Sequence, residues 1–416
     1  MHLLRRINDL HPEGLCLCAG VILQLDKSTR EISLGLILIW MAACLIRGIR
    51  PNRKDSANST LSTAYAIALG ILLFQTRTVM EGVNEEGISQ FLLIAGGIAA
   101  CSALHPGQWK RLLQWLSLAS AGVALLLLSH ISGEPEWMVT VYRDVFREGL
   151  GGNINKLGLA LTYLTMLSWA CTRISRHPLG RLLGAAGLAL GYATCWQNGS
   201  RMAVLAPVLG ILLGWTLAHT STFRAFPRKQ KLIAIAGLGI AVLSSIWLLA
   251  IRPLVQSGEG FWSDIGRINI AKCWISSLFT GHNRLIYGTG HSSDFIRHYC
   301  TLDKIFPWGN AVPSFGYAHN TFAQILGLYG LLGLSALAIL ASIYIRAFRL
   351  NYLREQRILR SSPRMASWTE VTLATLIAML ICAFAETSYH GDPVLQVLSG
   401  ILVSFPLNPV GKDDTP

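Results

Sequence analysis

The fold is decided where a polar insertion returns to apolar sequence, at Gly316-Tyr317-Ala318-His319-Asn320-Thr321-Phe322 followed by Gly327-Leu328-Tyr329-Gly330-Leu331-Leu332-Gly333-Leu334. The insertion runs from about residue 252 to residue 334 and separates two strongly apolar parts of the chain. Before His319 it carries three other histidines and the cations Arg267, Lys272, Arg284, Arg297 and Lys304. We therefore expect the chemistry here and a scaffold elsewhere.

The composition is that of a membrane protein. Of the 416 residues, 52% are hydrophobic and only 14% are charged, and the mean hydropathy is +0.45, whereas soluble domains carry about 25% charged residues. The net charge of +13 could suggest a nucleic-acid partner. The cations, however, fall in short clusters between apolar runs, which is how membrane topology is encoded. The sequence predicts an all-α polytopic membrane protein that binds no nucleic acid.

Twelve apolar runs are long enough to cross, or nearly cross, a hydrocarbon core of about 30 Å. They lie at about 13–25, 32–49, 60–76, 89–104, 112–132, 154–172, 180–196, 202–219, 232–251, 319–345, 369–388 and 391–407. The predicted organisation therefore has transmembrane helices 1–9 in residues 1–251 and one large loop region in residues 252–318. Helices 10–12 and a tail follow in residues 319–416.

The distribution of Lys and Arg predicts the orientation. Most of the 35 Lys and Arg fall in alternate connections, all on the side of the N-terminus, which by the positive-inside rule is the cytoplasm. Both termini are then inside, and the loop region 252–318 is outside. In a bacterium the outside compartment is the periplasm, which holds no ATP, so a synthetic reaction there must use a pre-activated donor.

The cysteines fall into two groups, those in apolar runs and those in the polar insertion. Most of the nine lie in apolar runs, where they are expected to be small core residues. Cys273 and Cys300 lie in the polar insertion, on the oxidising side of the membrane. Two alternatives stay open for this pair, a disulfide or two buried thiols.

A short exported connection, Gln197-Asn198-Gly199-Ser200-Arg201, places Arg201 near the membrane surface. One interpretation is a snorkelling interfacial anchor. The other is an anion site, because a guanidinium beside a helix N-terminus adds bidentate donors to unpaired backbone N–H groups. In the helix before this connection, Gly180-x3-Gly184 and Gly187-x3-Gly191 predict close packing against a neighbouring helix.

The insertion itself predicts a helix from about Ser263 through Ile275 with Arg267 near its start, then a loop around Gly288 and Gly290 that permits close backbone approach to a ligand. His319 is the best proton acceptor of the region, because histidine exchanges its proton near neutrality. The other histidines lack metal-ligand spacing, and no exported D-x-D occurs. We therefore expect neither a metal site nor a cofactor.

These motifs occur in an order that resembles the bacterial O-antigen ligase and polymerase superfamily. The resemblance covers about residues 150–335, and its most specific part is His-Asn with Gly-x-x-Gly. It rests on Asn153-Ile154-Asn155-Lys156-Leu157-Gly158, Gly199-Ser200-Arg201, Gly266-Arg267, Gly288-Thr289-Gly290, His319-Asn320-Thr321-Phe322 and Gly330-Leu331-Leu332-Gly333. The chain departs from the pattern at Ile154, where the family often has proline, which loosens the assignment of that helix.

The resemblance implies a metal-independent, inverting glycosyltransferase of the GT-C type in the bacterial inner membrane, with a periplasmic active site. Its donor would be O-antigen polysaccharide on undecaprenyl diphosphate, and its acceptor would be lipid A-core oligosaccharide, in lipopolysaccharide biosynthesis. Carried over by position, His319 would activate the acceptor hydroxyl, and Arg201 and Arg267 would bind the diphosphate. The further candidates for substrate binding are Asn320, Arg284, Arg297, Gly288 and Gly290.

Elementary chemistry leads to the same roles. A diphosphate leaving group needs its growing negative charge neutralised, and guanidinium groups can do this in the absence of a metal ion. A sugar hydroxyl is a poor nucleophile until a base takes its proton.

Alternatives to a ligase are an O-antigen polymerase, a protein O-oligosaccharyltransferase and, in another class, a secondary transporter. A polymerase often has two large exported loops, and a transporter would show inverted repeats and midplane charges; the sequence shows one such loop and no repeat.

Overall fold

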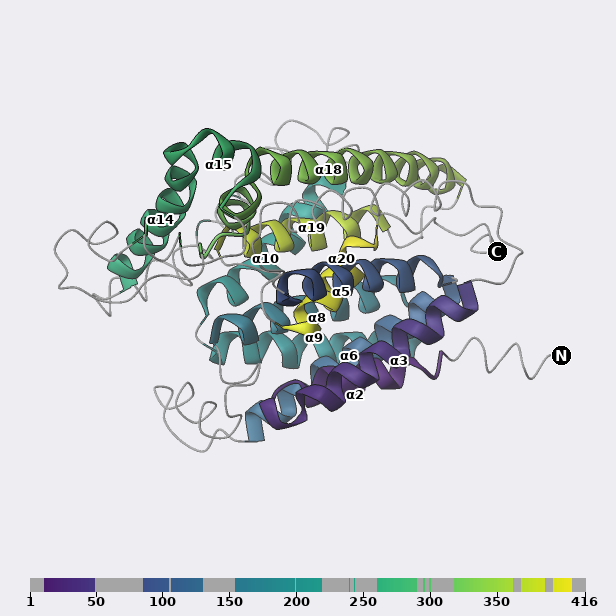
Figure 1. Ribbon diagram of the computed structural model, residues 1–416. Helices are drawn as coiled ribbons and strands as arrows, with labels where there is room; N and C mark the ends of the chain where they lie inside the picture. The colour runs from purple at the N-terminus through teal and green to yellow at the C-terminus, as the bar shows by residue number, and fades with distance from the viewer. Residues whose placement is uncertain are drawn as a thin grey trace.

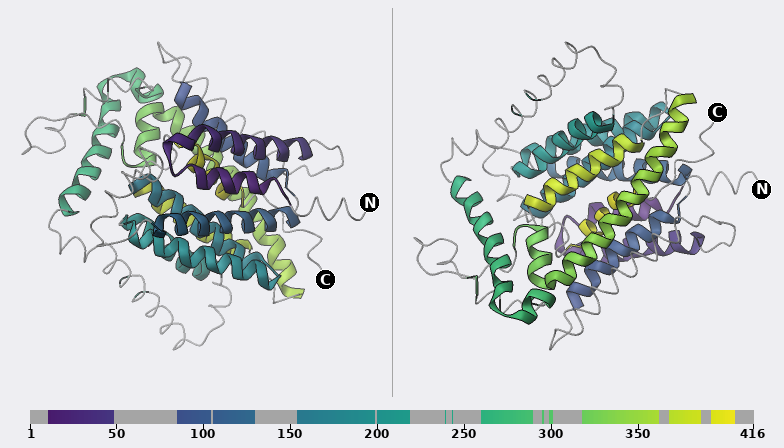
Figure 2. Two further views of the ribbon diagram at one scale, coloured as in Figure 1. Left: turned by 90° about the horizontal axis from the view of Figure 1, so that it is seen from below. Right: turned by 90° about the horizontal axis from the view of Figure 1, so that it is seen from above.

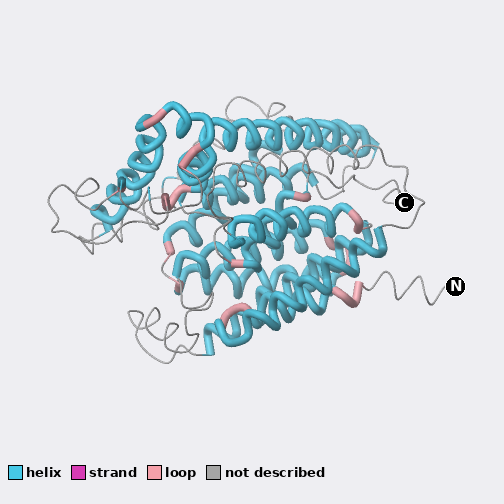
Figure 3. The backbone as a smooth tube through the Cα atoms, in the orientation of Figure 1, coloured by secondary structure: helices cyan, strands magenta, loops and turns pink. Residues whose placement is uncertain are grey.

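The computed structural model describes residues 11–48, 85–104, 106–129, 154–198, 200–218, 239, 243, 260–289, 295, 299–300, 318–361, 368–385 and 392–405. Helices and their connections make up these residues, with no strand among them (Figure 3). The all-α prediction is confirmed for this part of the chain.

The helices follow the predicted apolar runs closely (Figure 1). Their bounds are α2 Gly14–Leu23, η1 Lys27–Thr29, α3 Arg30–Gly48, α5 Glu85–Ser102, α6 Pro106–Ser129, α8 Ile154–Ile174, α9 Pro178–Gln197, α10 Arg201–Ala218, α14 Gly260–Ser276, η4 Ser277–Thr280, α15 His282–Tyr287, α18 Thr321–Ser361, α19 Trp368–Ala385 and α20 Pro393–Val403. The predicted runs 60–76 and 232–251 lie outside the described residues, except for the helical Gly239 and Leu243.

Helix α18 differs from its prediction. It continues sixteen residues past the expected end at 345, to Ser361, because this basic segment is rich in Arg and Leu, which favour helices. The buried Glu355 also ties its end to α19 by accepting a hydrogen bond from the Thr369 amide at 3.0 Å. Within α18, Gly330 is non-helical, with φ 58° and ψ −149°. The predicted run 319–345 thus contains a bend at Gly330, which the apolar pattern alone does not indicate.

The glycine face of α9 packs as predicted. Gly180, Gly184, Gly187 and Gly191 are all buried. A Cβ on Gly184 would lie 2.6 Å from the Thr172 amide of α8, and one on Gly187 would lie 2.6 Å from the Ser117 carbonyl oxygen of α6. Small residues thus let the backbones of α6, α8 and α9 approach within a distance that any larger side chain would prevent.

The helices pack around two separate apolar clusters. The larger one includes Trp40, Leu116, Tyr163 and Leu398 and fills the bundle made by α2, α3, α5, α6, α8, α9, α10, α19 and α20. The smaller one joins α14 to the start of α18. We call residues 260–289 together with 318–330 the α14 unit; Figures 1 and 2 show it at one end of the bundle.

Contacts between helix ends establish which connections share an end of the bundle. Gly158 at the start of α8 faces Ser200, which precedes α10. At the other end of α8, Arg173 forms an ion pair with Glu370, at the start of α19, with 2.8 Å between nitrogen and oxygen. At the far end of α19, the Phe384 carbonyl accepts a hydrogen bond from Asn320. Ser200 and Asn320 therefore lie at the same end, which we call the His319 end; the opposite one is the Arg173 end.

Clusters of cations lie at the Arg173 end. The connection between α8 and α9 and the start of α6 supply Arg173, Arg176, Arg181, Lys110 and Arg111. The last turn of α3 lies at the same end, because the start of α3 is tied to the end of α2 by the hydrogen bond from Ser33 Oγ to the Gly20 carbonyl, 2.7 Å, and the start of α2 packs against Trp115 of α6. These are residues that the positive-inside rule groups on the cytoplasmic side.

Two described segments, Lys27–Ile46 and Gly107–Ser129, are long and apolar enough to cross a membrane. In Lys27–Ile46 the apolar side chains Ile32, Ile39 and Ile46 follow one another at intervals of seven residues and are 60%, 55% and 68% exposed. This face of α3 is therefore an apolar surface with no covering from the described part of the protein. The twelve-span topology stays a prediction.

Candidate functional site

His319 lies in a short connection that is fixed on both sides. The Ala318 amide donates a 2.8 Å hydrogen bond to Oε1 of the buried Gln324. On the other side, Oδ1 of Asn320 accepts from the Ala323 amide at 2.9 Å and so caps the start of α18. His319 is held between these two anchors with a φ of 49°.

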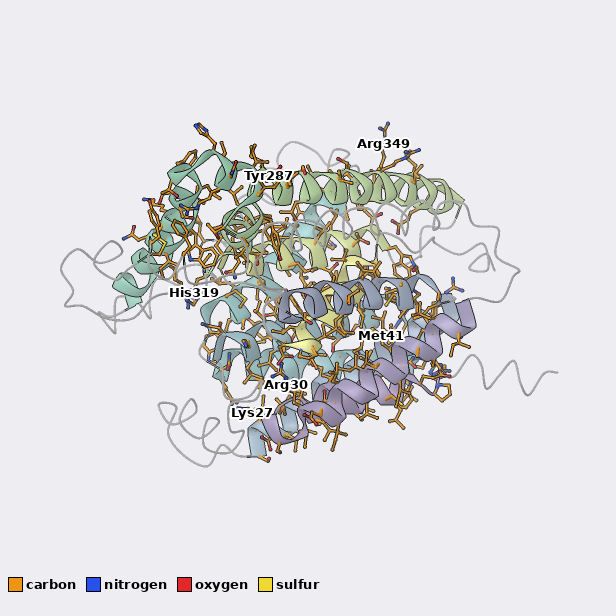
Figure 4. The ribbon with its side chains drawn as sticks, viewed as in Figure 1. Lys27, Arg30, Met41, Tyr287, His319 and Arg349 are labelled. Atoms are coloured by element: carbon orange, nitrogen blue, oxygen red, sulfur yellow. A yellow bond between two sulfur atoms is a disulfide. The ribbon has the colours of Figure 1, made fainter. Side chains whose placement is uncertain are left out.

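The backbone of His319 is in the left-handed region, which few non-glycine residues adopt and which costs on the order of 1 kcal/mol or more. Such a conformation persists only where its surroundings enforce it, and it occurs preferentially at functional sites. The Gln324 and Asn320 hydrogen bonds are the enforcing contacts. His319 is half-buried, and Figure 4 shows it within the α14 unit at one end of the bundle.

Asn320 also joins the His319 connection to the bundle. Its Nδ2 donates to the Phe384 carbonyl at 3.0 Å, which uses an acceptor that the end of α19 leaves unpaired. Next to this bond the rings of Phe322 and Phe384 are tilted against each other with 4.8 Å between centroids. Asn320, which was predicted to bind substrate, thus uses both its side-chain oxygen and its side-chain nitrogen in hydrogen bonds within the protein, and these bonds hold the segment that contains His319.

Helix α14 carries Arg267 as predicted. One turn further on, Ile270 belongs to the smaller apolar cluster together with Ala318, the residue before His319. The same cluster therefore places both the cation-bearing helix and the histidine connection. Arg267 is half-buried, and no hydrogen bond or ion pair with another described residue engages its guanidinium.

A disulfide connects Cys273 of α14 to Cys300, with 5.8 Å between the two Cα atoms. Of the two alternatives that the sequence left open for this pair, the structure has the disulfide. Both residues are buried in the cluster that contains Ala318. The covalent bond therefore fixes the helix that carries Arg267 to the segment leading towards His319.

The predicted glycine loop packs against α18. A Cβ on Gly288 would lie 2.2 Å from the carbonyl oxygen of Leu328, and the Thr289 amide donates to the Gly327 carbonyl at 2.9 Å. Gly288 thus allows a close approach to the backbone of α18. The predicted approach of its backbone to a ligand stays a prediction. The other glycine of this motif, Gly290, lies outside the described residues.

Arg284 has partners within the protein. Its Nη1 donates to Thr280 Oγ1 at 2.7 Å, and its guanidinium carbon lies 3.6 Å from the centroid of the Phe295 ring. This stacking is a cation–π contact that fixes the guanidinium plane. Arg284 therefore has a structural contact, whatever its role towards substrate, and Arg297 lies outside the described residues.

Arg201 is the first residue of α10, at the His319 end. Its side chain and Gly199 lie outside the described part. Asn198 and Ser200 are buried, and a Cβ on Gly158 would lie 3.0 Å from the Asn198 Nδ2 and Ser200 Oγ atoms. The glycine of the Asn-Lys-Leu-Gly motif therefore allows Asn198 and Ser200 to pack directly against α8.

Sequence reasoning missed Asp392, which lies at the same end. It is only 5% exposed and caps α20, its Oδ1 accepting from the Val394 amide at 3.0 Å. Its Oδ2 accepts a hydrogen bond from Nε2 of Gln24, the residue after α2, at 3.2 Å. The positive charge of Lys156 favours the charged form of this carboxylate. The only signal in the sequence is the pair Asp392-Pro393, which is typical of a helix start.

These residues come together from distant parts of the chain. His319, Asn320 and the start of α10 lie at the same end of the bundle, and the smaller apolar cluster joins the Arg267 helix to the segment that contains His319. No group of three or more His, Cys, Asp or Glu among the described residues could hold a metal ion. The arrangement puts His319 and the two helices that carry Arg201 and Arg267 at the same end of the bundle.

Comparisons with known proteins add no relationship. No protein-family model and no curated protein matches the chain.

Proposed function

We propose that this protein is an O-antigen ligase, a glycosyltransferase that moves O-antigen polysaccharide from undecaprenyl diphosphate to lipid A-core oligosaccharide. The observation that carries the proposal is the common placement of His319 and Arg267. Both belong to elements packed on the same apolar cluster, one as an anchored base and the other as a cation without a described partner. The start of α10 adds Arg201 at the same end.

The proposed setting is a bacterial inner membrane crossed by about twelve helices. The apolar face of α3, the small-residue packing of α9 and the cations at the Arg173 end support this setting. The Arg173 end then lies in the cytoplasm. The His319 end, with the α14 unit, faces the periplasm, the compartment in which a disulfide such as Cys273–Cys300 forms and persists.

In the proposed reaction the neutral imidazole of His319 takes the proton of an acceptor sugar hydroxyl. The oxygen attacks the anomeric carbon of the donor, a new glycosidic bond forms, and the bond from that carbon to the diphosphate oxygen breaks. The electron pair leaves with undecaprenyl diphosphate, whose growing negative charge Arg201 and Arg267 stabilise through bidentate hydrogen bonds. In-line attack inverts the anomeric configuration. The protein supplies position and charge, and the donor supplies the free energy.

The direct test combines a deletion strain with a purified assay. A ligase deletion leaves bare lipid A-core while polymer accumulates on the carrier lipid, whereas loss of an O-antigen polymerase leaves core bearing a single repeat. Purified protein given lipid-linked donor and lipid A-core should then form the full-length product. A single-repeat phenotype, or transfer to protein in place of lipid A-core, would replace the ligase proposal with one of its alternatives.

A further inference from the structure

Gln324 is a buried polar side chain in the first turn of α18. Only 1% of it is exposed, and its Oε1 accepts the hydrogen bond from the Ala318 amide at 2.8 Å. The Gln324 amide donates to the Asn320 carbonyl at 2.9 Å, as in a regular helix. The backbone of Gln324 therefore belongs to α18, while its side chain reaches back past His319. Ala318 is fully buried too, so without Gln324 its amide would lose this partner away from water.

The hydrogen bonds on the two sides of His319 attach it to different parts of the protein. Asn320 attaches the connection to the end of α19, whereas Gln324 holds Ala318 in the smaller apolar cluster. The same cluster includes side chains of α14, the helix that carries Arg267. The Gln324 bond therefore relates the position of His319 to that of α14.

The direction of the imidazole depends on these attachments. The φ of His319, 49°, lies in the left-handed region, and a residue with a Cβ that is released from it moves to the β or the right-handed region. That change redirects the bond from Cα to Cβ and moves the imidazole with it. A base must lie within about 3 Å of the atom whose proton it takes, so even a small displacement slows the chemical step.

We propose that Gln324 is a positioning residue: by holding the Ala318 amide it keeps His319 in the left-handed conformation that directs the imidazole towards the acceptor hydroxyl. This role rests on the ligase reaction proposed above, in which Gln324 contacts no reacting atom. The arginines proposed to bind the donor diphosphate lie on α10 and α14, whose own helices do not include this hydrogen bond. Loss of the bond should therefore slow the chemical step and spare the binding of the donor.

Thermal unfolding of the purified protein tests the hold on His319 without reference to catalysis. Gln324→Met has a similar length but no oxygen acceptor, and His319→Gly relieves the strain of a positive φ. The greater freedom of glycine in the unfolded chain is the same in both backgrounds and cancels. We expect the change in Tm caused by His319→Gly to be more favourable in the native protein than in Gln324→Met, by about 1–2 °C. In the control Gln108→Met, which removes a buried glutamine at the Arg173 end, the change should equal the native one. Equal changes in all three backgrounds would overturn the proposal.

Transfer kinetics test the consequence separately. Gln324→Met should lower kcat by about tenfold or more and leave the KM for the lipid-linked donor nearly unchanged. Gln324→Glu keeps an oxygen acceptor for the Ala318 amide and should restore most of the kcat. Gln324→Asn, which is one methylene shorter, breaks the same bond and replaces the methionine variant if that one does not fold. Equal losses of kcat in Gln324→Met and Gln324→Glu, or a raised KM with a native kcat, would overturn the positioning role.

The Tm comparison does not depend on glycan transfer. The expected Tm difference in a protein without any transfer activity would contradict the ligase proposal and leave the hold of Gln324 on His319 in place.

Discussion

Gly330 lies backbone to backbone against Gly288, and Gly288 in turn lies against Leu328 and Tyr329, the two residues before Gly330. A Cβ on Gly330 would lie 2.6 Å from the Gly288 nitrogen and 2.6 Å from the Ile286 carbonyl oxygen. Both glycines have positive φ, 78° and 58° respectively, a conformation that residues with a Cβ adopt at a cost. The contact fixes the end of α15 at the bend of α18. The α14 unit owes its shape to this pair.

Gly330→Ala should therefore destabilise the α14 unit. The added Cβ meets backbone atoms that cannot rotate away, and the positive φ alone costs about 1–2 kcal/mol. We expect a clear drop in the Tm of the purified protein and a loss of transfer activity. Gly281→Ala is the matched control, because Gly281 has an extended φ of −174° and nothing within 4 Å of its Cβ position. Equal Tm values for the two variants would show that the contact is not required.

The Cys273–Cys300 disulfide should stabilise the same unit. It closes a loop over a sequence separation of 27 residues, for which the chain-entropy model gives about 3.5 kcal/mol. Reductant should lower the Tm and the transfer activity of the native protein. A Cys273→Ser, Cys300→Ser variant should start from the lower values and should not respond further to reductant. A response in the double variant would locate the sensitive thiol among the other cysteines.

Arg201→Lys and Arg267→Lys test whether the diphosphate is held by planar guanidiniums. Lysine keeps the charge but loses the bidentate fork, so we expect transfer to fall by about tenfold or more, as for the loss of a charge-assisted hydrogen bond. Arg349→Lys, an exposed arginine of α18 far from the His319 end, is the control and should be fully active. Full activity of both Arg201→Ala and Arg267→Ala with normal expression would point instead to Arg284 or Arg297.

His319→Asn is the sharpest test of the base. Asparagine adopts positive φ more readily than most residues, so this variant keeps the strained backbone and removes the imidazole. Donor binding should survive while the chemical step is lost, since a base acts mainly in the transition state. In the native protein activity should rise with pH across the range in which histidines lose their proton. An activity that falls over that range would assign His319 to holding phosphate as an imidazolium.

Two substitutions of Asn320 separate its two hydrogen bonds. Asn320→Asp keeps the oxygen that caps α18 but loses the Nδ2 donor to the Phe384 carbonyl, whereas Asn320→Ala loses both. We expect the alanine variant to be less stable than the aspartate variant by about 1 kcal/mol, the usual contribution of a helix cap. Thermal unfolding of the two proteins measures the difference. Equal stability would mean that the cap contributes nothing to α18.

Local properties of the sequence determined most of the fold. The length of an apolar run and the residues at its ends decide where a helix forms, so the predicted run 154–172 and the observed α8, Ile154–Ile174, nearly coincide. The glycine spacing in α9 predicted close packing for the same reason: one face of a helix can be read from its period. Helix α14 was likewise predicted from Ser263 through Ile275 and extends from Gly260 to Ser276.

Only the tertiary structure decided which residues meet, because partners distant in the chain are chosen by packing and not by local pattern. It put Gly288 against Leu328, engaged Arg284 with Phe295, and buried Asp392 beside Gln24, 368 residues away. It also chose the disulfide from the two alternatives for Cys273 and Cys300. The strained backbone of His319 has the same origin, since hydrogen bonds from residues on both sides hold a conformation that the isolated sequence would not adopt.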